Sequence, residues 1–203
     1  MRRIRHLTPQ YIYSKTFYAL YRAQKPDTPW LTQDAIDIIE QLILSSDQGV
    51  EFGSGSSTKW FAERCAHLTS IEHDAQWYQL VSKKIIDAEL KAKVNLRLCS
   101  TENEYLKQIS TFEDYSLDFC LVDGKYKRDK VAIEAIKKIK SGGILIVDNA
   151  NWYLPNSKTK SPDSLRSISE CSESWKNFYD LVRNYRCIWT SNNITDTAIW
   201  FIA

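Results

Sequence analysis

A chain of 203 residues, with 43% hydrophobic and 26% charged residues, suits one domain with a substantial buried core. Its net charge of +2 excludes a broadly basic protein, and so gives no overall electrostatic argument for a nucleic-acid partner. No apolar run approaches the roughly 20 residues of a membrane span. The five cysteines are widely spaced without a CxxC pair, so we expect a reduced, cytoplasmic protein.

The first 30 residues are polar and rich in aromatic side chains. A small basic cluster lies at their start and consists of Arg2, Arg3, Arg5 and His6. Such a cluster is typical of a solvated tail, and docking to an anionic surface is the less favoured interpretation. Pro26 and Pro29 then interrupt regular structure. We therefore separate residues 1–30, a helical or extended segment and candidate substrate lid, from a domain spanning residues 31–203.

Short apolar runs alternate with helical patterns through the rest of the chain. The seven expected strands cover residues 49–52, 68–72, 94–98, 117–122, 144–147, 187–190 and 197–202. Thr32 is expected to cap the helix before the first strand, and Thr101 with Glu104 has the spacing of a capping box. Gly142 and Gly143 are expected to end the helix before the fifth strand.

The alternation of strands and helices predicts a doubly wound α/β domain with a mostly parallel sheet and helices on both faces. Residues 191–193 are too few for a crossover helix between the last two strands. Those strands should therefore pair antiparallel as a hairpin.

A glycine- and serine-rich turn follows the first strand, with the sequence Glu51-Phe52-Gly53-Ser54-Gly55-Ser56-Ser57-Thr58. Glycines let a backbone turn sharply beside a ligand, and the next helix offers free N–H groups to a carboxylate or phosphate. Glu72 ends the second strand, where a carboxylate can accept hydrogen bonds from both ribose hydroxyls. A solvated strand end or a helix cap is the alternative interpretation of Glu72. Together the turn and Glu72 predict a nucleotide-like ligand.

Two features separate the candidate ligands. A dinucleotide site needs a third glycine, but the corresponding region holds Ser57, Thr58 and Lys59. Glu51 would repel a pyrophosphate, whereas it suits the cationic end of S-adenosylmethionine. Both features argue against NAD and favour S-adenosylmethionine as the cofactor.

These segments, with Leu121-Val122-Asp123-Gly124 and the run Gly142–Asn149, resemble the class I S-adenosylmethionine-dependent methyltransferases over roughly residues 30–202. The resemblance implies a Rossmann-like, seven-stranded sheet with its last strand antiparallel. It also implies that the methionine moiety lies near the glycine turn, the ribose near Glu72, and the adenine near Cys99 and Ser100. The implied cofactor contacts are Glu51, Gly53, Ser54, Gly55, Ser57, Thr58, Glu72, His73, Cys99, Ser100 and Asp123.

Some of these assignments have alternatives. Cys99 and Ser100 also fit a strand end followed by a polar cap, and His73 also fits an exposed loop histidine.

Acidic and amide side chains follow the fourth and fifth strands. Asp123, Asp148 and Asn149 resemble the ligand set of metal-dependent catechol-type O-methyltransferases, which implies Mg²⁺ and a catalytic role for both aspartates. The alternative is that Asp123 contacts cofactor or acceptor without metal, while Asp148 and Asn149 shape the loop. That group has a lysine three positions after the first aspartate, where this chain has Tyr126. Lys125 is our candidate for the missing catalytic amine.

Further residues near this end of the sheet could contact the acceptor. The candidate substrate contacts are Tyr126, Trp152 and Tyr153, of which the last two could instead pack on the sheet. A basic run past Asp123 contains Lys125, Lys127, Arg128 and Lys130. Such a run is typical of a solvated face, and it would indicate an anionic acceptor if it faced the pocket.

We therefore expect a methyltransferase acting on a small molecule, with a hydroxyl oxygen as the favoured acceptor. A metal-free enzyme that methylates nitrogen or oxygen of a sugar or another metabolite is the alternative. A non-catalytic cofactor-binding subunit is an alternative of another class, although it would not need the pair Asp123 and Asp148. No base-flipping motif is found, so we expect no nucleic-acid partner. A homodimer is left open.

Overall fold

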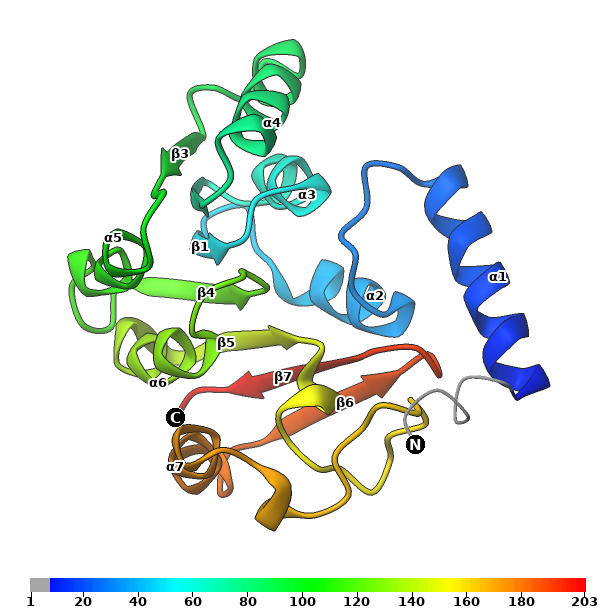
Figure 1. Ribbon diagram of the computed structural model, residues 1–203. Coiled ribbons are helices and arrows are strands. Elements are labelled where there is room, and N and C mark those ends of the chain that lie inside the picture. Colours follow the sequence, from blue (N-terminus) through cyan, green and yellow to red (C-terminus); the bar gives the residue numbers. More distant parts are fainter. Residues whose placement is uncertain (1–7) are drawn as a thin grey trace.

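A seven-stranded sheet in the order β3-β2-β1-β4-β5-β7-β6 runs through the protein, as the computed structural model shows (Figure 1). The structure describes residues 8–203, so the basic cluster at residues 2–6 lies outside the described part. The strands are β1 (Gln48–Phe52), β2 (His67–Glu72), β3 (Val94–Leu98), β4 (Leu117–Val122), β5 (Ile139–Asp148), β6 (Cys187–Ser191) and β7 (Asp196–Phe201). Because β7 is antiparallel to both neighbours and the pairs among β1–β5 are parallel, the predicted Rossmann-like sheet is confirmed.

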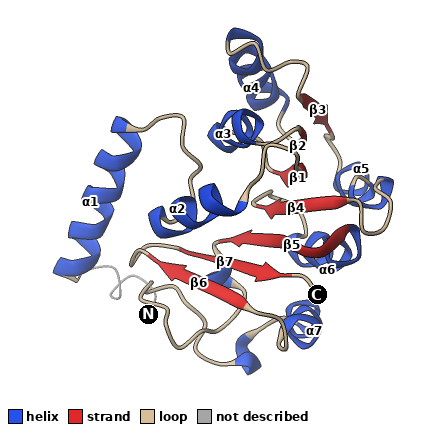
Figure 2. Cartoon of the chain, turned by 180° about the vertical axis from the view of Figure 1, so that it is seen from behind, coloured by secondary structure: helices blue, strands red, loops and turns tan. Residues whose placement is uncertain are grey.

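Helices cover both faces of this sheet (Figures 1 and 2). They are α1 (Pro9–Gln24), α2 (Gln33–Leu42), α3 (Ser56–Arg64), α4 (Ala75–Asp87), α5 (Glu102–Lys107), α6 (Arg128–Lys138) and α7 (Glu173–Val182), with short 3₁₀ turns η2 (Ile109–Thr111), η3 (Ala150–Trp152) and η4 (Ile168–Glu170). Phe119 and Leu121 of β4 pack under α2 and α3, whereas Cys120 and Val122 pack under α5, α6 and α7. This alternation is the two-residue period of a strand buried on both faces.

The start of β5 differs from the prediction. The expected helix end at Gly142 and Gly143 is wrong, because α6 already ends at Lys138 and both glycines lie within β5. The pairing of β5 with β4 shifts register between Leu117 and Phe119, and Gly142 has a φ of +84° beside this shift. The two glycines therefore mark an irregularity within a strand. Glycine is common at such irregularities, just as it is common at helix ends.

The two predicted helix caps differ in whether their side chains make the capping hydrogen bonds. Thr101 and Glu104 form the expected capping box, each side chain accepting from the other residue's backbone N–H at 3.3 Å. Thr32 is the N-cap residue of α2, as predicted, but its side chain makes no capping hydrogen bond. Its hydroxyl instead contacts the Thr190 hydroxyl, and its N–H donates to Thr197 Oγ1 at 3.2 Å. Contacts with β6 and β7 therefore replace the local cap.

The N-terminal helix α1 lies to one side of the sheet and is the first regular element described (Figures 1 and 2). It has no buried residue of its own. The Tyr18 hydroxyl donates to the Leu31 carbonyl at 3.2 Å, and Asn193 Nδ2 donates to Ser14 Oγ at 3.0 Å. Across residues 8–203, no helix has both the length and the apolar character of a membrane span.

Candidate functional site

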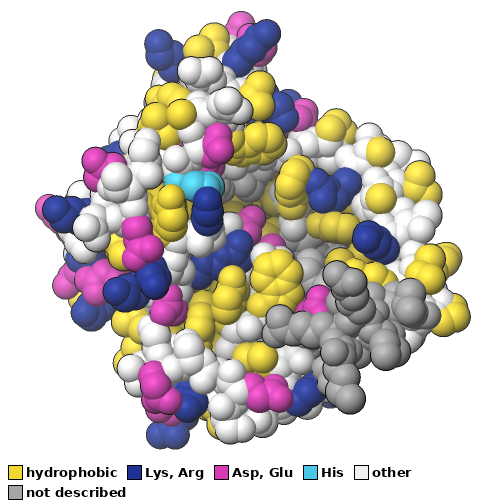
Figure 3. Space-filling view, viewed as in Figure 1, with side chains coloured by type: hydrophobic (Ala, Val, Ile, Leu, Met, Phe, Trp, Pro, Cys, Tyr) yellow, Lys and Arg dark blue, Asp and Glu magenta, His cyan; other side chains and the backbone are white. Residues whose placement is uncertain are grey.

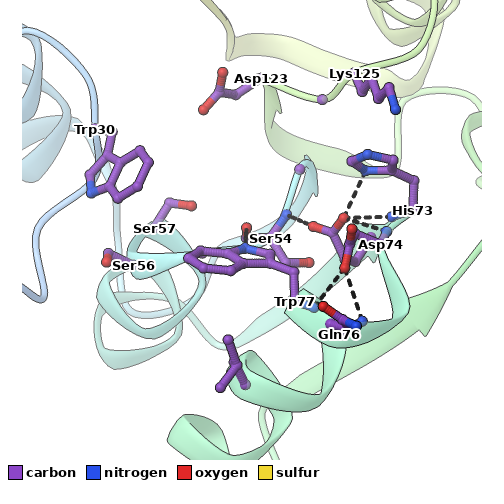
Figure 4. Close-up of a pocket in the computed structure, with 15 residues that line it drawn as sticks. Trp30, Ser54, Ser56, Ser57, His73, Asp74, Gln76, Trp77, Asp123 and Lys125 are labelled. Atoms are coloured by element: carbon purple, nitrogen blue, oxygen red, sulfur yellow. Dashed lines mark hydrogen bonds and ion pairs between the residues drawn. The ribbon is translucent and has the colours of Figure 1, made fainter.

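A cavity of about 570 Å³ opens at the carboxyl ends of β1, β2 and β4 (Figure 4). In open α/β sheets this is the end at which ligands bind. The structure brings together in its lining the predicted residues Gly53, Ser54, Gly55, Ser57, Glu72, His73, Asp123 and Lys125. Its lining does not include the predicted contacts Glu51, Thr58, Cys99, Ser100, Asp148 and Asn149.

The turn between β1 and α3 forms the floor of the cavity, and Gly53 makes this turn possible. Gly53 has a φ of +101°, which side chains rarely adopt. A Cβ added there would lie 3.0 Å from the Asp123 carbonyl carbon and from the Gly124 nitrogen. The turn is tied to its neighbours, because Gly53 N donates to the Ile71 carbonyl at 2.9 Å and Asp123 N donates to the Phe52 carbonyl at 2.9 Å. The loops after β1 and β4 are therefore packed against each other without space for a side chain.

Glu51 lies beneath this turn and is fully buried. Its carboxylate accepts hydrogen bonds from Ser57 Oγ and Ser70 Oγ, both at 2.7 Å, and from the Thr58 hydroxyl. Burial raises the pKa of Glu51 to about 7, although the three hydroxyls act in the opposite direction. Since Glu51 does not line the cavity, its contacts hold the turn against the start of α3.

Glu72 lines the cavity at the end of β2 with 2% of its surface exposed. Its carboxylate accepts from the backbone N–H groups of Ser54 at 3.0 Å, His73 at 2.7 Å and Asp74 at 2.8 Å (Figure 4). Two carboxylate oxygens offer about four acceptor positions. Glu72 therefore orders the turn and the start of α4. Its Oε1 also lies 2.7 Å from His73 Nδ1, so Oε2, which accepts only from Ser54, keeps one acceptor position.

Two tryptophans that the sequence analysis did not select also line the cavity (Figure 4). The rings of Trp30 and Trp77 have centroids 6.4 Å apart, and Trp77 Nε1 donates to the Ser54 carbonyl at 2.7 Å. Trp77 could have been recognised, because it lies in the first turn of the helix that follows Glu72. Trp30 could not, because it precedes the glycine turn by a whole helix and strand.

The predicted adenine contacts, Cys99 and Ser100, are not part of this lining. Cys99 is buried in the hydrophobic cluster that contains Tyr105, and Ser100 is exposed. The remaining unpredicted residues along the cavity are Ser56, Asp74, Gln76, Leu80 and Gly124. Gln76, Trp77 and Leu80 belong to α4, so this helix supplies one side of the cavity.

The Arg128 guanidinium lies among the three side chains predicted to hold Mg²⁺. Its Nη2 donates to Asp123 Oδ1 at 2.8 Å, and its Nη1 donates to Asn149 Oδ1 at 3.0 Å. The Asp148 carboxylate instead accepts from Thr197 Oγ1 at 2.9 Å, through Oδ1. Within the described part of the chain, no group of three His, Cys, Asp or Glu side chains could hold a metal ion. Because a guanidinium already holds oxygens of Asp123 and Asn149, the predicted set does not fit Mg²⁺.

The electrostatics of this cluster follow from its burial. The Asp148 side chain is 3% exposed, and burial raises its pKa, as does the nearby charge of Asp123. Arg128 has been interpreted from the sequence as part of a solvated basic run, yet its side chain is only 12% exposed. The sequence gives no local signal for this inward orientation.

The predicted substrate contacts do not line this cavity. Tyr126 packs edge-on against His73, with ring centroids 5.3 Å apart. Tyr153 stacks on Trp175 at 4.7 Å, and Trp152 is 47% exposed. Tyr126 and Tyr153 therefore pack against other aromatic side chains, whereas Trp152 stays exposed.

A second cavity of about 610 Å³ adjoins the first and shares Trp30, Ser56 and Trp77 with it. Helix α1 contributes Tyr18 and Arg22 to its lining. Figure 3 shows the molecule hollowed on this face, between α1 and the end of the sheet. Burial raises the pKa of the Tyr18 hydroxyl, as does the charge of Asp148. The second cavity therefore lies beside the N-terminal helix and meets the first cavity, which Asp123 lines, at Trp30, Ser56 and Trp77.

Comparisons with known proteins agree with this fold. No family model matches the sequence, and no curated protein matches it. Similar solved structures include a protein assigned as a caffeoyl-CoA O-methyltransferase from Staphylococcus aureus, with a TM-score of 0.64 and 18% identity over 95% of this chain and 100% of that one. An O-methyltransferase from Bacillus cereus, solved in complex with SAH, has a TM-score of 0.61 and 16% identity over 93% of this chain and 89% of that one.

An rRNA methylase from Streptococcus thermophilus is also similar, with a TM-score of 0.52 and 13% identity over 81% of this chain and 90% of that one. The shared fold thus occurs in proteins with different acceptors. The chain has the Rossmann-like fold of these methyltransferases.

Proposed function

We propose that the protein is an S-adenosylmethionine-dependent methyltransferase that acts on a hydroxyl oxygen of a small molecule. The observation that carries this proposal is the cavity whose floor is the Gly53 turn and whose side is Glu72. The Bacillus cereus neighbour, solved with SAH, supports the choice of cofactor.

The first cavity offers a place for each end of the cofactor. The acceptor position left on Glu72 suits a ribose hydroxyl. The first turn of α3, at Ser56 and Ser57, has N–H groups without a partner within the helix, and these suit the methionine carboxylate. Trp77 offers a flat apolar surface for the adenine. We propose this orientation because Asp123, the candidate base, lines the same cavity as Glu72 and the turn.

Methyl transfer needs an in-line arrangement of acceptor oxygen, methyl carbon and sulfur. The oxygen lone pair forms the new O–C bond while the C–S bond breaks, and that electron pair stays on the sulfur. The hydroxyl proton passes to a base. Asp123 and Lys125 are our candidates, because both line the cavity directly after β4. Asp148 lines neither cavity, so we assign it a supporting role at the end of β5.

The second cavity is the proposed acceptor site. Its volume is within the roughly 300–1,000 Å³ of small-molecule pockets. Because α1 supplies Tyr18 and Arg22 to its wall, we propose that residues 1–30 serve as a lid over the acceptor. A macromolecular acceptor would need a surface beyond this cavity. The net charge of +2 gives no general attraction for nucleic acid.

We also propose a reducing, cytoplasmic setting. All five cysteines are free, and Cys65, Cys99, Cys120 and Cys171 are buried. Formation of a homodimer stays a prediction.

A screen with S-adenosylmethionine labelled in its methyl group tests the activity. We expect label to appear on the oxygen of a hydroxyl-bearing metabolite. The Asp123→Ala variant should lose about 100-fold or more in turnover, as expected for removing a catalytic acid–base group. Its affinity for S-adenosylmethionine should change little, which calorimetry can check.

Two results would contradict parts of this proposal. Label found only on nitrogen would show that the acceptor atom is nitrogen and not a hydroxyl oxygen. Loss of cofactor binding in Asp123→Ala, equal to its loss of turnover, would make Asp123 a cofactor contact and remove its catalytic role.

A further inference from the structure

We infer that the Arg128 guanidinium replaces a divalent metal ion at the catalytic end of this sheet, so that methyl transfer requires no metal. This inference rests on the proposed function for its catalytic consequence. The position of the guanidinium is a property of the fold and can be tested separately.

All five N–H donors of Arg128 are used at this point. Nε donates to the Gly124 carbonyl at 2.6 Å, and Nη2 donates to the carbonyl and to Oδ1 of Asp123, at 2.7 and 2.8 Å. Nη1 donates to the Asp148 carbonyl at 2.8 Å and to Asn149 Oδ1 at 3.0 Å. A guanidinium has five N–H groups and stays charged in proteins. A permanent cation therefore lies among five oxygen atoms, as a metal ion would.

The local backbone directs Arg128 inward. Arg128 is the first residue of α6, and the preceding Lys127 has a φ of +38°, in the left-handed region. This turn brings the side chain back across the ends of β4 and β5, where it bonds to residues of both strand ends. The guanidinium thus joins two loops that a metal ion would otherwise join.

The other side chains of the cluster are arranged for this cation. Asn149 also has a left-handed φ, of +51°, and its Nδ2 donates to Thr195 Oγ1 at 2.7 Å. That bond leaves the amide oxygen facing Arg128. The Asp148 carboxylate is bonded to Thr197 instead. Mg²⁺ needs near-octahedral oxygen ligands at about 2.1 Å, and it would be repelled by a guanidinium already holding these oxygens.

Arg128 is a positioning residue in this account, because its five donors are taken and none is left for a substrate. It holds the Asp123 carboxylate at the cavity wall. The charge that it supplies is fixed, so the site does not depend on the supply of metal.

Binding of Mn²⁺ alone, measured by electron paramagnetic resonance, tests the inference. The folded wild-type protein should bind no Mn²⁺ at millimolar concentrations, and EDTA or Mg²⁺ should leave its melting temperature unchanged. The Arg128→Met variant keeps an unbranched side chain but removes the charge. It should gain Mn²⁺ binding, because the oxygens of Asp123, Asp148 and Asn149 then lack a cation.

Two matched variants separate charge from structure. Arg128→Lys keeps a cation and should gain no Mn²⁺ binding. Lys130→Met removes an exposed cation from the same helix and should also gain none. A merely structural role for Arg128 predicts no difference in Mn²⁺ binding among these variants.

Several outcomes would overturn the inference. They are Mn²⁺ binding to the wild type, absence of a gain in folded Arg128→Met, or labelled methyl transfer that stops in EDTA and returns with Mg²⁺. If Arg128→Met does not fold, Mn²⁺ binding to the wild type still tests the inference. Failure of the proposed function looks different, because the wild type would then exclude Mn²⁺ and yet bind no S-adenosylmethionine.

Discussion

Glu72→Ala should weaken S-adenosylmethionine binding by about tenfold or more. In the proposed orientation this carboxylate accepts one ribose hydrogen bond, and a bond to a charged group contributes about 1.5–3 kcal/mol. Its loss corresponds to about one to two powers of ten in Kd. Isothermal titration calorimetry measures the effect directly, at a temperature where the variant is folded.

The matched control is Asp74→Ala, two residues further along the chain. Asp74 also lines the cavity, but its Oδ1 accepts from the N–H groups of Gln76 and Trp77 and so caps α4. Its loss should cost about 1 kcal/mol of stability through the helix cap, and change the Kd little. An equal loss of affinity in both variants would show that general negative charge, and not Glu72, holds the ribose.

Gly53→Ala should reduce cofactor affinity at least tenfold and destabilise the fold. The left-handed φ of this residue costs an alanine of order 1–3 kcal/mol. The added Cβ would also press on the backbone of Asp123 and Gly124 at 3.0 Å, so the loops after β1 and β4 must move apart. Because these two loops form the cavity floor, binding and stability should fall together in calorimetry and thermal melting.

Gly142→Ala separates backbone strain from displacement of the site. Gly142 also has a positive φ, of +84°, but no atom lies within 4 Å of a Cβ added there. This variant should lose stability through strain while binding S-adenosylmethionine like the wild type. Wild-type affinity in Gly53→Ala would mean that the turn does not contact the cofactor.

The order of strands and helices could be predicted because burial imposes short periods on the sequence. The run at residues 144–147 is apolar throughout, and the run at residues 117–122 is apolar except for Asp118, since both faces of β4 and β5 are covered. The short connection between β6 and β7 fixed their antiparallel pairing. The bulge at Gly142 could not be predicted, because it depends on how β5 passes β4.

The candidate site could be predicted only in part. The turn at Gly53 and the carboxylate of Glu72 follow strand ends, so topology alone brings them together. The orientation of Arg128 depends on a left-handed Lys127 and on oxygens from two separate loops. A local run of basic residues does not reveal such long-range contacts, so the sequence predicted Mg²⁺ at a site where the structure places the Arg128 guanidinium.

The role of Glu51 could not be predicted from the sequence either. The sequence suggested that its charge would face the cationic end of the cofactor. The structure buries it under hydroxyls, where burial raises its pKa. The preference for S-adenosylmethionine over NAD thus depends on the missing third glycine, because Ser57 and Thr58 occupy that region and bond to Glu51.

Calorimetric titration of the wild-type protein with S-adenosylmethionine, its demethylated product and NAD tests the central claim most directly. We predict that S-adenosylmethionine binds with one molecule per chain, that the demethylated product competes with it, and that NAD gives no binding. The absence of binding by both S-adenosylmethionine and its product, or tighter binding of NAD, would contradict the claim.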